Sequence, residues 1–95
     1  IHFAAYSLVG ESVASPEKYF ENNLEKGARL IAALVENGVN RFVLSSTAAV
    51  YGAPAVVPIQ ETHPPAPENP YGVSKHCLEW LLNSYHRTHG LEVAF

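Results

Sequence analysis

The chain has 95 residues, enough for one small domain whose single core gives only marginal stability on its own. With a formal net charge of -3 and no block of Lys or Arg, we expect no nucleic-acid partner. Its one Cys excludes an intrachain disulfide, and no apolar run reaches the roughly 18 residues of a membrane span. These features predict a cytoplasmic protein without a membrane partner.

Both ends of the chain are apolar. The run Ile1–Ala5 is typical of a short buried strand, the run Leu91–Phe95 resembles the start of another, and there is no initiating Met. We therefore expect a segment of a longer protein, with each end lying inside a structural element.

The first predicted helix begins with Ser15 as its N-cap and Pro16 at its first position, and Glu17 suits the positive end of the helix dipole. Apolar residues then recur at spacings of three and four, which predicts one buried face, until Asn37-Gly38 ends the helix. The positions on this face are Tyr19, Phe20, Leu24, Leu30, Ile31, Leu34 and Val35.

The next element is a continuous apolar run, Phe42-Val43-Leu44, which favours a strand of a parallel sheet covered on both faces. Ser45, Ser46 and Thr47 follow at its carboxyl end. Six of the seven prolines fall between Gly52 and Pro70, so we predict a loop there, between a strand end and a helix start, where active-site loops commonly lie.

A second helix is predicted from Asn69-Pro70 to His89-Gly90, before the final strand-like tail. Its inward positions are Val73, Cys77, Leu78, Leu81, Leu82 and Tyr85. The order strand-helix-strand-helix-strand implies right-handed parallel crossovers, hence an α/β fold that is part of a doubly wound parallel Rossmann-type sheet.

Tyr71 and Lys75 stand four residues apart, which places both side chains on one face of the second helix near its start. A phenol is a poor base at neutral pH, but an adjacent ammonium and the positive helix end both favour its ionised form. Tyr71 is therefore a candidate acid/base, although this spacing by itself also occurs by chance.

The surroundings of this pair carry a family resemblance. The stretches LSSTAAVYG at 44–52 and PYGVSK at 70–75, joined by a proline-rich loop, resemble the active-site half of the extended short-chain dehydrogenases/reductases. The resemblance implies that Tyr71 is the base, that Lys75 lowers its pKa and holds the nicotinamide ribose, and that Thr47 hydrogen-bonds the reacting oxygen of the substrate. For Ser45 and Ser46, strand-end capping is at least as good an explanation as a direct role.

The stretches HFAAYSLVGESV at 2–13 and YFENN at 19–23 are similar to the UDP-glucose 4-epimerase branch of that family. In this branch the first strand end and the following loop pass beside NAD, and the first Asn of the pair, here Asn22, helps to fix that loop and the cofactor. Some members have Lys where this chain has Ser7, so a cationic contact to NAD is in question. The implied cofactor-binding residues are Phe3, Ala4, Ala5, Tyr6, Ser7, Asn22, Tyr71 and Lys75.

The resemblance further implies a UDP-sugar substrate, bound by Thr47 and Tyr71, that is oxidised and re-reduced at C4, which interconverts UDP-glucose and UDP-galactose. Residues 1–95 would form the second half of an NAD-binding Rossmann domain. No glycine-rich Gly-x-Gly-x-x-Gly motif and no carboxyl-terminal substrate domain are present in this stretch. We therefore expect the isolated segment to be inactive and the longer protein to form a homodimer.

Other interpretations remain open. Another nucleotide-sugar epimerase, decarboxylase or dehydratase would share these motifs, but dehydratases typically have Asp-Glu where this chain has Ala48-Ala49. A non-catalytic dinucleotide-sensing domain would keep the fold without needing Tyr71 beside Lys75. The five histidines show no ligand spacing, so no metal site is predicted, and Cys77 is interpreted as a structural thiol.

Overall fold

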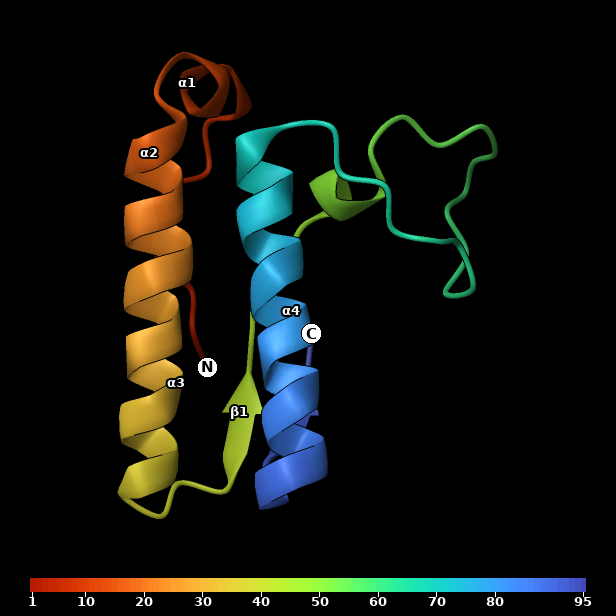
Figure 1. Ribbon diagram of the computed structural model, residues 1–95. Helices are drawn as coiled ribbons and strands as arrows, with labels where there is room; N and C mark the ends of the chain where they lie inside the picture. The colour runs from red at the N-terminus through yellow and green to blue at the C-terminus, as the bar shows by residue number, and fades with distance from the viewer.

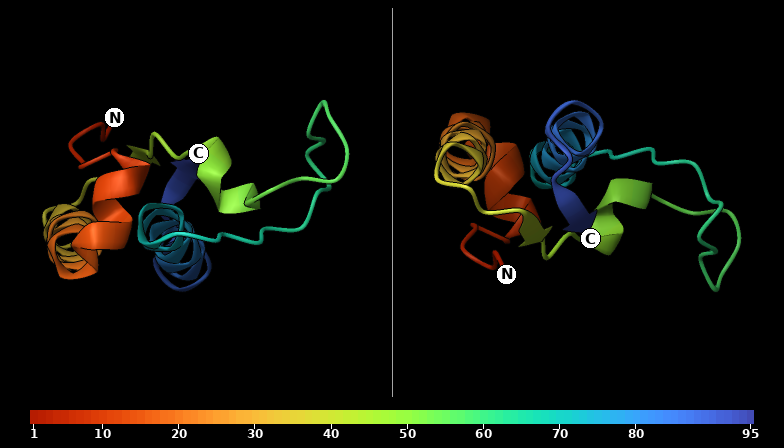
Figure 2. Two further views of the ribbon diagram at one scale, coloured as in Figure 1. Left: turned by 90° about the horizontal axis from the view of Figure 1, so that it is seen from above. Right: turned by 90° about the horizontal axis from the view of Figure 1, so that it is seen from below.

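The computed structural model describes residues 1–95, which form one layer of helices on one small parallel sheet. Two long helices lie side by side against the strands. The proline-rich loop that precedes the second of them, residues 52–69, reaches away from the rest of the molecule (Figure 1). Seen along the helices, both lie on the same side of the strands (Figure 2). The thinnest extent is 18 Å, which is the depth of a helix layer and a sheet layer.

The sheet is built from strands β1 (Arg41–Val43) and β2 (Glu92–Ala94), which pair in parallel with Phe42 opposite Val93. On the other side of β1, His2 forms a parallel bridge with Leu44, in which its N–H donates to the Val43 carbonyl at 2.8 Å. A helix separates each pair of neighbours in the chain. The predicted parallel α/β order is therefore confirmed, with the first strand reduced to a single bridge.

The predicted burial of the strands is wrong in two places. Ile1 and Phe3 are 83% and 72% exposed, so the first segment is not a buried strand. In β1 only the Phe42 side chain is buried, and Val43 on the opposite face is 41% exposed. Both differences have one cause: residues 1–95 supply helices to one face of the sheet and no element to the other.

The first long helix runs continuously through α2 (Pro16–Tyr19), the π-helical turn η1 (Phe20–Glu25) and α3 (Lys26–Glu36), because the residues at both junctions keep right-handed helical dihedral angles. It ends before Gly38 (φ 77°), as predicted. Ser15 stands at its N-cap, but the Ser15 side chain makes no capping hydrogen bond. The short helix α1 (Val9–Ala14) precedes it and was not predicted.

The π turn changes which residues of this helix face inward. The buried positions recur every four residues, at Tyr19, Asn23, Gly27 and Ile31. In an α-helix of 3.6 residues per turn, positions four apart turn gradually around the axis and would not stay on one face. The wider turn at η1 compensates for that rotation. Leu30, expected on the buried face, is 38% exposed.

The second long helix, α4 (Pro70–His89), has the predicted ends. The Asn69 side chain accepts a hydrogen bond from the Gly72 N–H at 2.9 Å, and Gly90 closes the helix in the left-handed conformation. Its inner face joins one apolar core, formed by Ile31, Phe42, Leu44, Leu78, Leu82 and Leu91. A short 3-10 helix, η2 (Ala48–Tyr51), precedes the loop. None of these helices combines the length and apolar character needed to cross a membrane.

Candidate active site

Thr47 lies where the chain leaves β1 and enters η2. Its backbone is extended, and its Oγ1 accepts a hydrogen bond from the Ala49 N–H at 3.1 Å, which caps η2. Because a hydroxyl both donates and accepts, this cap leaves the Thr47 proton available to a substrate oxygen. The side chain lines a cavity of about 750 Å³ between η2, the loop and α4. This placement suits the predicted contact of Thr47 with the substrate.

Lys75 is buried at 3% exposure, an unusual position for an ammonium group. Its Nζ donates a hydrogen bond of 2.6 Å to the Ser45 carbonyl at the end of β1. Burial lowers the pKa of Lys75, and the nearby Glu79 carboxylate opposes this by raising it. The structure thus ties the predicted cation of the site to the strand end two residues before Thr47.

Tyr71 is half-buried in the first turn of α4, and its ring meets the edge of the Tyr19 ring at 6.3 Å. Tyr19 itself is fully buried, and its hydroxyl lies 2.8 Å from both the Leu8 carbonyl and a Glu11 carboxylate oxygen. Burial, followed by the Glu11 carboxylate, raises the pKa of Tyr19. Of these two tyrosines, only Tyr71 has a hydroxyl without a hydrogen-bond partner in the chain, which leaves that hydroxyl free to exchange a proton with a ligand.

The three predicted catalytic side chains make no direct hydrogen bond to one another, and Tyr71 and Lys75 do not line the cavity that Thr47 lines. The backbone brings their elements together instead. Gly72 packs so tightly against η2 that a Cβ there would lie 2.5 Å from the Ala49 carbonyl oxygen. The first turn of α4 and the turn that begins at Thr47 therefore touch.

The loop after the first bridge is held by Asn23. The Asn23 Oδ1 accepts from the Tyr6 N–H and its Nδ2 donates to the Tyr6 carbonyl, both at 2.9 Å, and Nδ2 also lies 3.4 Å from Ser74 Oγ. Asn22 makes no bond to the loop and donates only to Asn23 Oδ1, at 3.2 Å. The hydrogen bonds to the loop come from Asn23, which the π turn directs inward, and not from Asn22, whose part in fixing the cofactor stays a prediction.

A second cavity of about 340 Å³ lies between this loop and α3. Ala4, Ala5, Tyr6 and Asn22 line it, as expected for residues beside a cofactor, whereas Phe3 and Ser7 point elsewhere and are exposed. Small side chains at Ala4 and Ala5 permit close approach of a flat group to the backbone. The residues present therefore fit a flat group of a dinucleotide.

Lys75 is electrostatically linked to this second cavity through His2. His2 lines the cavity, and its pKa is lowered first by burial and then by the positive charge of Lys75. Its one hydrogen bond, to the Ser45 carbonyl, holds the strand end before Thr47. Lys75 lines neither cavity, and its contact with the cofactor stays a prediction.

The whole chain, residues 1–95, matches the NAD dependent epimerase/dehydratase family. It belongs to that family of Rossmann-fold, NAD-dependent enzymes. Among its relatives, the UDP-glucose 4-epimerase of Streptomyces lividans is 50% identical over 91 residues, a match that covers 96% of this chain and 28% of the relative. The chain thus spans little more than a quarter of the relatives it matches.

Solved structures of the family show the same fold. The UDP-glucose 4-epimerase of Brucella ovis in complex with NAD superimposes with a TM-score of 0.94 at 39% identity, covering 97% of this chain and 28% of that chain. The dTDP-glucose 4,6-dehydratase DesIV of Streptomyces venezuelae, with NAD and TYD bound, gives a TM-score of 0.91 at 38% identity, covering 97% of this chain and 29% of that chain. Both confirm the NAD cofactor and the Rossmann-type fold for the family, across more than one reaction.

The sequence did not reveal one polar contact of the site, the hydrogen bond between the Ser46 hydroxyl and the Glu79 carboxylate. Glu79 is 8% exposed and lies on the same face of α4 as Lys75. Its carboxylate accepts a hydrogen bond from the Ser46 hydroxyl. The available signal was the spacing, because residues 75 and 79 are four apart on a face that also carries Leu78 and Leu82. Charged residues at inward helical positions mark a buried polar contact.

Proposed function

We propose that the longer protein carrying this segment interconverts UDP-glucose and UDP-galactose by oxidising and re-reducing the sugar at C4. The observation that carries the proposal is the buried Lys75. It follows Tyr71 by one helical turn and is hydrogen-bonded to Ser45, two residues before Thr47, in a chain of the NAD-dependent family. The 50% identity to a UDP-glucose 4-epimerase supports the choice of reaction.

Each residue has a distinct part in this reaction. Tyr71 is the base that takes the proton of the C4 hydroxyl. The Thr47 hydroxyl donates a hydrogen bond to the same sugar oxygen and keeps its proton. Bound NAD would supply the hydride acceptor for oxidation at C4 and the hydride donor for re-reduction of the 4-keto sugar on its other face. Tyr71 then gives its proton back to the sugar oxygen.

The second candidate reaction is dehydration, since a 4,6-dehydratase shares the fold. Elimination of water across C5 and C6 needs an acid and a base beside the sugar. At the two positions after Thr47 this chain has methyl side chains, and Ala48 lines the larger cavity. Because positions 48 and 49 carry no carboxyl group, oxidation and re-reduction at C4 is the better-supported reaction.

The test uses the longest native chain that contains this segment. UDP-galactose is added without NAD, and the appearance of UDP-glucose is followed for the native protein, Tyr71→Phe and Tyr85→Phe. We expect conversion by the native protein, a loss of at least ~100-fold in kcat for Tyr71→Phe, and little change for Tyr85→Phe, whose ring packs against the core and His89 away from the first turn of α4. A native protein that retains NAD but converts no UDP-galactose would move the assignment to another nucleotide-sugar reaction.

A further inference from the structure

Glu79 is a buried carboxylate to which the reaction above gives no part. It lies on α4 one turn after Lys75 and is 8% exposed. A buried carboxylate is costly unless hydrogen bonds satisfy it, so its contacts indicate what it does.

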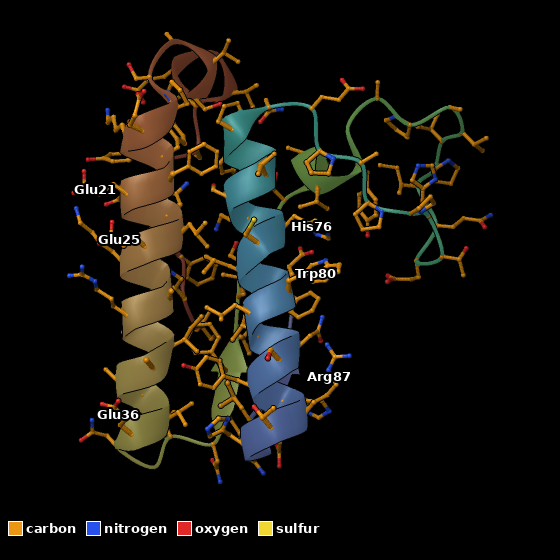
Figure 3. All side chains as sticks on the ribbon, viewed as in Figure 1. Glu21, Glu25, Glu36, His76, Trp80 and Arg87 are labelled. Atoms are coloured by element: carbon orange, nitrogen blue, oxygen red, sulfur yellow. The ribbon has the colours of Figure 1, made fainter.

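Both oxygens of the Glu79 carboxylate are occupied. Oε1 accepts a hydrogen bond from the Ser46 hydroxyl, and Oε2 pairs with His76 Nδ1 at 3.1 Å. His76 Nε2 in turn accepts from the Trp80 indole N–H at 3.0 Å, which leaves the His76 proton on Nδ1, directed at Glu79. Figure 3 shows His76 and Trp80 on the side of α4 that faces the loop. Glu79 therefore joins the strand end to an ordered row of side chains on α4.

The contact made by Glu79 parallels the one made by Lys75. Lys75 holds the Ser45 carbonyl at 2.6 Å, and one helical turn later Glu79 holds the hydroxyl of the next residue, Ser46. Thr47 follows immediately along the chain. Two residues of one helix thus fix two successive residues of the segment that carries the substrate-binding hydroxyl.

We propose that Glu79 is a positioning residue, which through Ser46 holds the strand end so that Thr47 and Lys75 keep their places in the reaction. The inference rests on the proposed function for the reaction it serves. A carboxylate that acted only in folding would affect stability, whereas a positioning carboxylate acts on kcat. An error of about 1 Å in the placement of a reacting group costs on the order of 100-fold in rate, so a loosened Thr47 has a measurable effect.

The experiment compares Glu79→Ala, Glu79→Gln and Ser46→Ala in the longest native chain that contains the segment, with the exposed Ser84→Ala on α4 as the control. Glu79→Ala and Ser46→Ala each break the contact, and we expect kcat to fall about 10- to 100-fold with KM changed less than about threefold. Glu79→Gln keeps an acceptor for the Ser46 hydroxyl and should recover most of this loss. Combining Ser46→Ala with Glu79→Ala should add little, because both remove the same bond.

A second readout does not depend on the reaction. Hydrogen exchange of the backbone at residues 44–51 should accelerate in Glu79→Ala and Ser46→Ala, while exchange at residues 26–36 stays as in the native protein. Native kcat together with native exchange at 44–51 in both variants overturns the inference, as does an equal loss of kcat in Glu79→Gln and Glu79→Ala. A native protein without epimerase activity refutes the proposed function instead, and the exchange measurement still decides the role of Glu79.

Discussion

The two neighbouring asparagines of the first long helix differ in what they hold. Asn23 is 1% exposed, and its side-chain amide hydrogen-bonds both the N–H and the carbonyl of Tyr6, as the backbone of a neighbouring strand does in a sheet. Asn22 is half-buried and lines the smaller cavity instead. One amide therefore supports the cofactor loop, and the other is placed to meet a group bound in the cavity.

This difference predicts opposite effects for two alanine substitutions. Asn23→Ala leaves the Tyr6 backbone groups unpaired in a part-buried site, so the free energy of unfolding should fall by about 2 kcal/mol. Asn22→Ala should change it by less than ~0.5 kcal/mol but reduce the NAD retained on purification. Urea unfolding and the absorbance of released NAD measure the two effects. Equal losses of stability would contradict this division of roles.

The sequence predicted which residues form the candidate site better than it predicted which groups they hydrogen-bond. Thr47, Tyr71 and Lys75 lie at adjoining turns, as the motif spacing indicates. The bond from Lys75 to a backbone carbonyl and the inward turn of Asn23 could not be foreseen. The first depends on a contact between residues 30 apart, and the second on one π turn that shifts the register of the helix.

At the scale of elements, α4 and η2 meet at a point where no side chain fits. A Cβ on Gly72 would lie 2.5 Å from the Ala49 carbonyl oxygen and 3.2 Å from Pro67 Cβ. The first of these neighbours is backbone and cannot rotate away. The close approach brings the turn of Tyr71 against the turn that follows Thr47, so the spacing of these two predicted catalytic residues depends on this glycine.

Gly72→Ala should therefore separate the two turns. We expect a loss of about 1–3 kcal/mol in the free energy of unfolding, typical of overpacking, and a fall in kcat of at least ~10-fold. Gly10→Ala in α1 is the matched control: a Cβ there meets nothing within 4 Å, so it should be neutral or slightly stabilising. Chemical denaturation and steady-state kinetics test both variants, and unchanged kcat in Gly72→Ala would show that the spacing tolerates a methyl group.

The elements that the sequence predicted are those with strong local signals. Asn69, Gly38 and Gly90 act at helix ends through their own backbone or side chain, and all three mark the observed ends. Helix α1 and the 3-10 helix η2 were missed, since each has six residues or fewer and shows no full apolar repeat. The burial of Phe3 was mispredicted because burial depends on a covering element and not on the strand itself.

For the whole molecule, the uncovered face of the sheet is the dominant feature. Both long helices lie on one side of the strands (Figure 2). Large apolar side chains of the strand segments, Phe3 and Val43, are 72% and 41% exposed. Doubly wound sheets carry helices on both faces and bind dinucleotides at the carboxyl ends of the strands. The 95 residues contain the helices of one face and no glycine-rich pyrophosphate loop.

Residues 1–95 alone should consequently bind NAD weakly and turn over no UDP-galactose. The predicted cofactor contacts of this segment are the smaller cavity and Lys75, but the backbone N–H groups that bind the pyrophosphate in this fold belong to the glycine motif. We expect the Kd for NAD to exceed that of the longest native chain by at least ~100-fold, equal to about 2.7 kcal/mol. Isothermal titration calorimetry of both proteins measures the difference, with circular dichroism to verify that the segment is folded. Equal affinities would mean that the loop held by Asn23 and the buried Lys75 supply most of the binding energy, and that the glycine motif serves to orient NAD more than to retain it.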